Sequence, residues 1–167
     1  MKIIIALFLI FTSTTQGISN SPSLAEVRTL YQKAATQEEA CNNLISILTP
    51  YSEKGNVVFD GYKACGTMML ANYTSNPFSK YQYFSEGKSG LEKSIELDNK
   101  NIELRYLRFT IQTNLPSFLE YNNSINEDKL FLINAMPAIT DLSLKQTIIS
   151  YLENSSYLTV VEKQKLK

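Results

Sequence analysis

Apolar residues recur every three or four positions along almost the whole of this 167-residue chain, as they do on one face of an α-helix. Breakers such as Pro50, Pro77 and Pro116 separate the periodic segments. No Asn-Gly or Asp-Gly hairpin turn is followed by alternating apolar residues, so the usual signals of β-strands are missing. The sequence therefore predicts an all-α fold of antiparallel helical hairpins, packed as a short array or an irregular bundle. The helices are expected over about residues 24–34, 37–48, 57–73, 78–97, 102–113, 125–136, 142–154 and 159–166.

Capping signals mark where several of these helices begin. Thr36 and Glu39 have the spacing of a capping box, in which the hydroxyl bonds a first-turn amide and the glutamate reaches back to the cap. The same spacing recurs at Ser124 and Glu127. Asp141 is expected to cap the helix that follows it.

Four of the six glycines fall inside predicted helices: Gly61, Gly66, Gly87 and Gly90. Each costs about 1 kcal/mol relative to alanine in a helix interior. Close approach of two helices is the natural compensation. Gly87, Gly90 and Ser94 share one face of their helix, and Gly61 lies one turn from Cys65 on the preceding one. We therefore expect these two helices to form a tightly packed antiparallel pair.

The same pair of helices resembles a tetratricopeptide repeat. The small, bulky, small and helix-ending positions of the repeat's second helix are matched by Gly87, Leu91, Ser94 and Asn99. The aromatic, apolar, small and bulky positions of its first helix are matched by Tyr62, Cys65, Gly66 and Met69. The loop around Pro77 would then be an insertion, and the next helix departs from the pattern because Arg105 and Arg108 replace apolar residues. The resemblance implies one degenerate tetratricopeptide-like hairpin.

Three segments carry a second resemblance: Gly61–Lys63, Asn76–Lys80 and Glu103–Phe109. Together they resemble an uncharacterised exported helical protein family of Bacteroidota. That resemblance implies a bacterial source, export and a helical fold, and it implies no particular activity.

The N-terminal segment has the order of a secretory signal peptide. After a basic start, the apolar run Ile3–Phe11 is too short to span a bilayer, and Thr15 and Gly17 stand where small residues precede a cleavage point. We expect a signal peptide over residues 1–17 and a single all-helical domain over residues 18–167. The mature protein would be periplasmic or secreted, with no stable membrane insertion after cleavage.

Composition excludes several function classes. Sixteen basic and sixteen acidic residues balance, so no net field favours nucleic acid as a partner. The chain contains no histidine, which excludes histidine-dependent acid–base catalysis and the usual zinc sites. No sequence motif indicates a catalytic residue, a cofactor or a metal ligand set, so we expect none of these.

Two cysteines could be joined. An antiparallel hairpin centred near Glu53 would place Cys41 and Cys65 at the same level, each on an apolar face. Export to an oxidising compartment permits a disulfide between them. The alternative is a pair of buried thiols that act as small hydrophobic side chains.

A polar stripe runs along the helix predicted over residues 102–113. At helical spacing it contains Asn101, Arg105, Arg108 and Gln112, and the other faces of the helix are apolar. A helix with so much apolar surface should be mostly buried, so its arginines need partners. The stripe could bind an anionic ligand or partner, or it could pair with internal carboxylates such as Glu92, Glu96 or Glu103.

Two further segments have alternative interpretations. Ser85 and Lys88 have the S-x-x-K spacing of penicillin-binding enzymes, but the partner motifs of those enzymes are missing and the spacing is expected once by chance. The apolar segment Pro116–Tyr121 interrupts the helical pattern. It could cover a groove as an ordered loop or fill the core between two helical layers.

These observations favour an exported, non-catalytic helical protein that binds a protein, a peptide or a small ligand in the cell envelope. The alternatives are a small periplasmic enzyme that uses carboxylates or the Ser85–Lys88 pair, and an envelope chaperone or complex subunit. Two close carboxylates in a pocket would favour the enzyme. A large exposed apolar patch would favour the chaperone or subunit.

Overall fold

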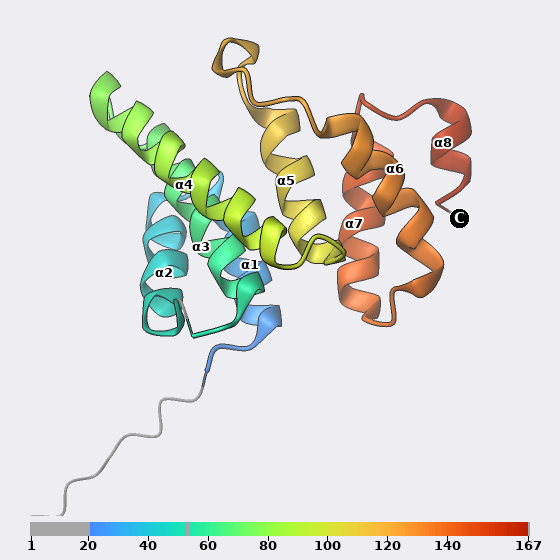
Figure 1. The fold of residues 1–167 in the computed structure, drawn as a ribbon, viewed down its shortest axis with the longest axis horizontal. Coiled ribbons are helices and arrows are strands. Elements are labelled where there is room, and N and C mark those ends of the chain that lie inside the picture. The colour runs from blue at the N-terminus through green and yellow to red at the C-terminus, as the bar shows by residue number, and fades with distance from the viewer. Residues whose placement is uncertain (1–20, 53, 167) are drawn as a thin grey trace, which may run out of the picture.

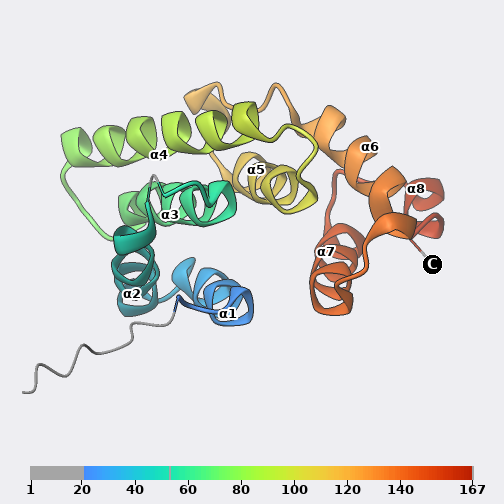
Figure 2. The same ribbon diagram turned by 60° about the horizontal axis from the view of Figure 1, so that its bottom comes forward.

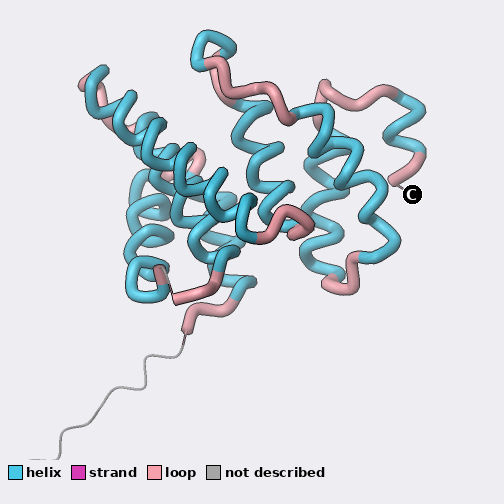
Figure 3. Tube along the Cα trace, in the orientation of Figure 1, coloured by secondary structure: helices cyan, strands magenta, loops and turns pink. Residues whose placement is uncertain are grey.

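The computed structural model describes residues 21–52 and 54–166, and within these ranges the chain forms helices and no strands (Figures 1 and 3). The all-α prediction is therefore confirmed, whereas the tetratricopeptide-like arrangement stays a prediction. The α-helices are α1 (Leu24–Ala34), α2 (Glu38–Leu48), α3 (Val57–Met69), α4 (Pro77–Leu97), α5 (Ile102–Asn114), α6 (Ile125–Ala135), α7 (Leu142–Asn154) and α8 (Val160–Gln164). Short 3-10 helices are η1 (Thr49–Tyr51), η2 (Leu70–Asn72), η3 (Ser117–Leu119) and η4 (Met136–Ala138).

The expected signal peptide at residues 1–17 lies outside the described residues. Within them, no helix combines the length and the apolar character that crossing a membrane requires.

Helix α5 lies between two groups of helices. Figure 2 shows α1 to α4 gathered on one side of α5 and α6 to α8 on the other. Leu104, Leu107 and Ile111 of α5 belong to the apolar core formed with α1 to α4. Tyr106 and Phe109 belong to a second core, formed with α6, α7 and the two residues that flank α8, Leu158 and Leu166. The nearly all-round burial predicted for this helix is thus explained by two cores that share it.

The glycines of α4 bring α3 and α4 into close antiparallel contact, as the sequence predicts (Figure 1). A Cβ atom on Gly87 would lie 2.4 Å from Cγ of Met68 and 2.5 Å from the carbonyl oxygen of Ala64, both on α3. A Cβ atom on Gly90 would lie 3.1 Å from Cβ of Ala64. Gly61 faces α5 instead, where a Cβ atom would meet Leu104 at 2.4 Å.

The cap predicted for α7 is found, whereas the capping box predicted for α2 is wrong. Oδ1 of Asp141 accepts the backbone N–H of Leu144 at 3.0 Å and caps α7. Helix α2 instead begins after Gln37, which makes no side-chain cap bond. The hydroxyl of Thr36 donates back to the Lys33 carbonyl at 3.4 Å, so it does not serve the amides of α2.

The second predicted capping box, before α6, is also wrong. Ser124 precedes the helix but makes no side-chain cap bond. Its backbone N–H donates to Oε1 of Gln112 at 3.2 Å, and Glu127 pairs with Arg105 of α5. Tertiary contacts to α5 therefore replace the local cap that the spacing suggested.

Candidate functional site

Arg108 lies inside the protein and binds two carboxylates. Its Nε and Nη2 donate to the two oxygens of Asp128 on α6, at 2.7 and 2.9 Å. Its Nη1 donates to Glu92 on α4 at 2.9 Å. Asp128 is fully buried and Arg108 is 6% exposed, so the two-pronged bond between α5 and α6 is out of contact with solvent, whereas the Glu92 side chain is 38% exposed.

Arg105, one turn earlier, pairs with the same helix. It forms ion pairs with Glu127 and Asp128, and its guanidinium lies 4.9 Å from the centre of the Phe131 ring. The hydrogen bond from Arg105 holds the pKa of the Glu127 carboxyl below its usual range. Both arginines of the stripe are therefore occupied by internal carboxylates.

The two amides of the stripe also have structural contacts. Oδ1 of Asn101 accepts the backbone N–H groups of Glu103 and Leu104 at 3.1 and 3.2 Å, which caps α5. Gln112 is buried and accepts the Ser124 amide of the loop before α6. The four residues share one helix face, as predicted, and that face holds α5 against α4 and α6. Of the two interpretations of the stripe, the structure shows the one in which its arginines pair with internal carboxylates.

A second ionic network, which the sequence did not reveal, lies on the opposite side of α5. Glu103 accepts from Nε and Nη2 of Arg28 at 2.7 and 2.9 Å, and from the Tyr62 hydroxyl at 2.7 Å. Nη1 of Arg28 donates to Asp141 at 2.7 Å. Buried Arg28 thereby joins α1 to α5 and to the cap of α7, and Tyr62 adds α3 through its bond to Glu103. Arg28 falls on the buried face of the first predicted helix, and a basic residue at such a position could have indicated a buried ion pair.

The stability of the protein is expected to fall in mild acid because of this network. The pKa of Asp141 is lowered because the Leu144 amide and Arg28 donate hydrogen bonds to its carboxylate. A carboxyl group with a lowered pKa stabilises the fold fully above its unfolded-state pKa of about 4, and this stabilisation is lost as the pH falls through the folded-state pKa. We expect the urea midpoint to decrease from about pH 5 downward, and to decrease less in Asp141→Asn, which keeps the cap and removes the charge.

Urea denaturation at a series of pH values measures this difference. Glu153→Gln is the matched control, because Glu153 is an exposed residue of the same helix for which the structure gives no ion pair. It should follow the parent profile. A profile of Asp141→Asn that coincides with the parent at every pH would contradict the assignment.

Cys41 and Cys65 are buried free thiols, so the disulfide interpretation is not what the structure shows. The thiol of Cys41 donates to the carbonyl of Gly66 at 3.2 Å, which places it at the predicted level of the hairpin. Burial raises the pKa of Cys41 to about 11 and also raises that of Cys65. Both thiols are protonated at neutral pH and act as small core side chains.

The Ser85–Lys88 pair does not form a catalytic arrangement in the structure. Ser85 is exposed on α4. The ammonium of Lys88 lies 4.8 Å from the centre of the Tyr121 ring and 5.9 Å from that of Phe84. No hydrogen bond between Ser85 and Lys88 is found among the described residues, and a serine nucleophile requires a base within hydrogen-bond reach.

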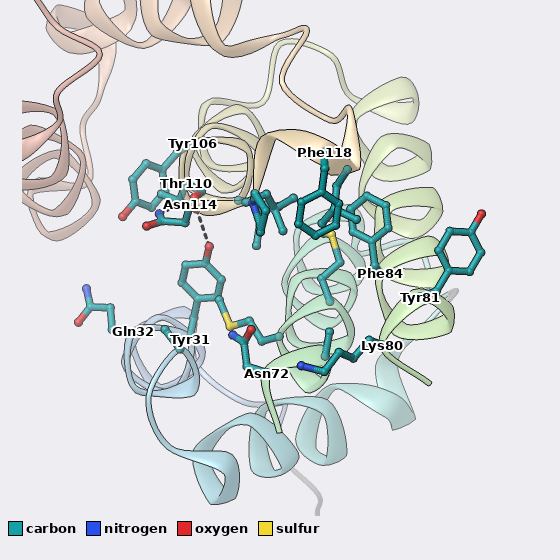
Figure 4. Close-up of a pocket in the computed structure, with 18 of the residues that line it drawn as sticks. Tyr31, Gln32, Asn72, Lys80, Tyr81, Phe84, Tyr106, Thr110, Asn114 and Phe118 are labelled. Atoms are coloured by element: carbon teal, nitrogen blue, oxygen red, sulfur yellow. Dashed lines mark hydrogen bonds between the residues drawn. The ribbon is translucent and has the colours of Figure 1, made fainter. Parts of the chain in front are cut away.

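A cavity lies where α1, α3, α4 and α5 meet η3, and it is lined in part by the segment that the sequence suggested could cover a groove. Its volume is about 920 Å³, which is within the range of small-molecule sites (Figure 4). Phe118 of η3 lines it and is 79% exposed. The segment Pro116–Tyr121 therefore both lines the cavity and, through buried Tyr121, contributes to the core.

The floor of the cavity is mostly apolar, and two of its three hydroxyl groups, those of Tyr31 and Thr110, are bonded to each other. The floor residues are buried side chains: Tyr31, Met68, Phe84, Tyr106, Thr110 and Ile111. The hydroxyls of Tyr31 and Thr110 share a hydrogen bond of 2.5 Å, which Figure 4 shows as a dashed line. Burial raises the pKa of Tyr31 well above its usual value, so the phenol stays neutral.

A shallower polar cavity of about 570 Å³ adjoins this one and shares Gln32, Tyr106 and Tyr151 with it. Its other lining residues lie on α7 and are uncharged: Ser143, Gln146, Thr147, Ser150 and Asn154. The apolar cavity therefore continues into a surface that offers neutral hydroxyl and amide groups.

Comparisons with known proteins add nothing to this geometry, since no family model, curated protein or solved structure matches the chain. Across the described ranges, no group of three or more histidine, cysteine, aspartate or glutamate residues is placed to hold a metal ion. The ion pairs around α5 and the aromatic cavity are thus the two features from which a function can be argued.

Proposed function

We propose that this protein is an exported, non-catalytic binding protein of the bacterial cell envelope, and that its ligand occupies the cavity between α1, α3, α4, α5 and η3. The observation that carries the proposal is the cavity itself, with a buried aromatic and aliphatic floor open to solvent at its rim. Export is supported by the signal-peptide pattern of residues 1–17, and the source by the resemblance to the Bacteroidota family.

The chemistry of the cavity favours binding over catalysis. Tyr31 at its floor is neutral, and the carboxylates that the enzyme alternative would use are held by arginines elsewhere. Apolar floors with few polar groups are typical of sites that bind ligands by excluding water. The enzyme alternative therefore has no specific observation in its favour within the described residues.

A partner protein is the second candidate, and exposed aromatic residues favour it. Tyr81 and Phe118 stand at the rim, 67% and 79% exposed, and Phe78 lies one turn before Tyr81 on α4 with 76% exposure. Aromatic side chains in such positions are enriched in binding interfaces. If the protein is a chaperone or a subunit of an envelope complex, its partner would cover these residues. The double variant Phe78→Ser, Phe118→Ser tests this second candidate, because it should abolish complex formation with a peptide that the parent binds.

Ligand binding can be tested with a neutral apolar dye whose fluorescence rises when it leaves water, such as N-phenylnaphthylamine. We expect saturable binding to the mature parent protein in the micromolar range, as for small ligands that gain mainly from apolar contact. Ala35→Trp should weaken dye binding about tenfold or more, because Ala35 lines the cavity and a misfit of about 1.4 kcal/mol is a factor of ten.

The matched control is Ala25→Trp, which introduces the same side chain at an exposed alanine of α1 that does not line the cavity, whereas Ala35 directly follows that helix. The chain has no tryptophan of its own, so both variants carry a single indole. Ala25→Trp should bind the dye like the parent. Equal dye affinity in the parent and both variants would place the dye elsewhere and contradict the proposed site.

A further inference from the structure

Charge is distributed very unevenly around the cavity. Of the described residues that line it, Lys80 alone carries a formal charge at neutral pH, and none is acidic. Lys80 belongs to the exposed rim, whereas the floor is buried and apolar. A ligand that fits both parts needs an apolar body for the floor and an anionic group at the rim.

Lys80 is placed to meet such a group. It lies in the first turn of α4, and Figure 4 shows its side chain directed across the mouth of the cavity toward Asn72, while Tyr81 points away. Lys80 makes no ion pair with any described residue. By contrast, Lys129 is bound to Glu162 at 2.9 Å. The ammonium of Lys80 is thus an unneutralised charge beside an apolar site.

The floor also limits what the body of the ligand can be. The Tyr31 hydroxyl is bonded to Thr110, whose own hydroxyl donates to the Leu107 carbonyl at 2.8 Å. The amide of Asn114 donates to the Thr110 carbonyl at 2.8 Å. A peptide backbone placed beside Tyr31 and Thr110 would find both hydroxyl protons already donated, so most of its own N–H and C=O groups would stay unbonded, which costs free energy. A hydrocarbon body has no such groups.

We propose that the cavity takes a singly charged anionic amphiphile, a medium-chain carboxylate being the simplest, with its hydrocarbon body on the floor and its carboxylate at Lys80. This inference rests on the proposed function and specifies its ligand. A neutral amphiphile fills the floor and leaves the ammonium without a partner. A cationic one places like charges together at the rim.

Displacement of N-phenylnaphthylamine by decanoate and by decanol tests the proposal, because the two share one alkyl chain and differ in charge. In the parent, decanoate should bind about tenfold more tightly than decanol, as expected for one ion pair at a partly screened surface. This preference should shrink as the salt concentration rises. Titration calorimetry with each compound alone provides the same comparison without the dye.

Three variants assign the preference to one side chain. Lys80→Gln removes the charge and should bind decanoate and decanol equally. Lys80→Arg keeps the charge and should retain the preference. Lys93→Gln, at an exposed lysine of α4 that does not line the cavity, should behave like the parent. Thermal melting checks that each variant is folded.

The outcomes separate this inference from the proposed function. If decanoate and decanol bind the parent equally, or if Lys80→Gln keeps the preference, the anionic ligand class is wrong while the cavity remains a binding site. If the dye, decanoate and decanol all fail to bind the folded parent, both proposals are overturned.

Discussion

An Arg108→Ala variant is expected to lose about 3 kcal/mol of unfolding free energy, because it removes the fork that neutralises a fully buried carboxylate. Breaking one side of a buried pair typically costs about 3–5 kcal/mol, since the remaining charge has no water around it. Arg105 still contacts Asp128, which keeps the loss at the lower end of that range. Changing both arginines to alanine should therefore be worse than changing Arg108 alone. Urea denaturation measures each loss.

Two controls separate the buried charge from the loss of packing. Lys93→Ala, at an exposed position of α4, should shift the free energy of unfolding by no more than about 0.5 kcal/mol. The double variant Arg108→Met, Asp128→Leu removes both charges and should be more stable than Arg108→Ala. If the Arg105→Ala, Arg108→Ala protein unfolds at the parent's urea concentration, the pairs contribute nothing, and the stripe becomes a candidate binding site again.

Gly87→Val is expected to cost about 3 kcal/mol or more, or to prevent folding, because the new side chain would overlap α3. Its Cβ atom would stand 2.4 Å from Cγ of Met68, 2.5 Å from the Ala64 carbonyl oxygen and 2.8 Å from the Met68 amide nitrogen. Two of these three atoms belong to the backbone and cannot move without displacing the helix. Far-UV circular dichroism during thermal unfolding measures the effect.

Gly90→Ala, one turn along the same helix, is the matched control. Its Cβ atom would meet Cβ of Ala64 at 3.1 Å, which is a tight contact with a side chain, and the nearest backbone atom, Cα of Ala64, lies at an ordinary 3.9 Å. The gain of about 1 kcal/mol in helix propensity should offset most of the cost of this contact. If the Gly87→Val protein has the same melting temperature as the Gly90→Ala protein, α3 and α4 do not approach so closely.

Local patterns predicted the helices well, because helix periodicity and breakers act within a few residues. The predicted helix over 24–34 agrees with α1, and the predictions for α4, α5 and α7 are within one residue of the observed bounds at each end. The close packing at Gly87 was also predictable, since a glycine that weakens its helix implies a neighbour that needs the space.

Contacts between distant segments were harder to predict. The stripe on α5 indicated that its arginines needed partners, and Glu92 was correctly among the candidates. Asp128 and Glu127 were missed as partners. Glu127 fits a capping box equally well, and local spacing does not reveal whether a side chain caps its own helix or pairs with a distant arginine. The pairing of Arg28 with Glu103 spans 75 positions, beyond any periodic signal.

The cavity depends on the same long-range geometry. Its floor joins residues of α1, α3, α4 and α5, each of which has the apolar pattern of an ordinary core position. Only the interruption of helical spacing at Pro116–Tyr121 indicated that something other than regular packing occurs there. Whether such an interruption fills a core or lines an opening is decided by the helices that surround it.

The position of α5 has a consequence for how the protein responds to cleavage of its chain. Since one helix completes both apolar cores, neither half of the chain contains all the surfaces that it needs to fold. A cleavage within the loop before α5 would deprive the first half of Leu104 and Leu107, and a cleavage after α5 would deprive the second half of Tyr106 and Phe109. The two ends of the protein are therefore interdependent, because a change that unfolds either half also destabilises the other through the helix that they share.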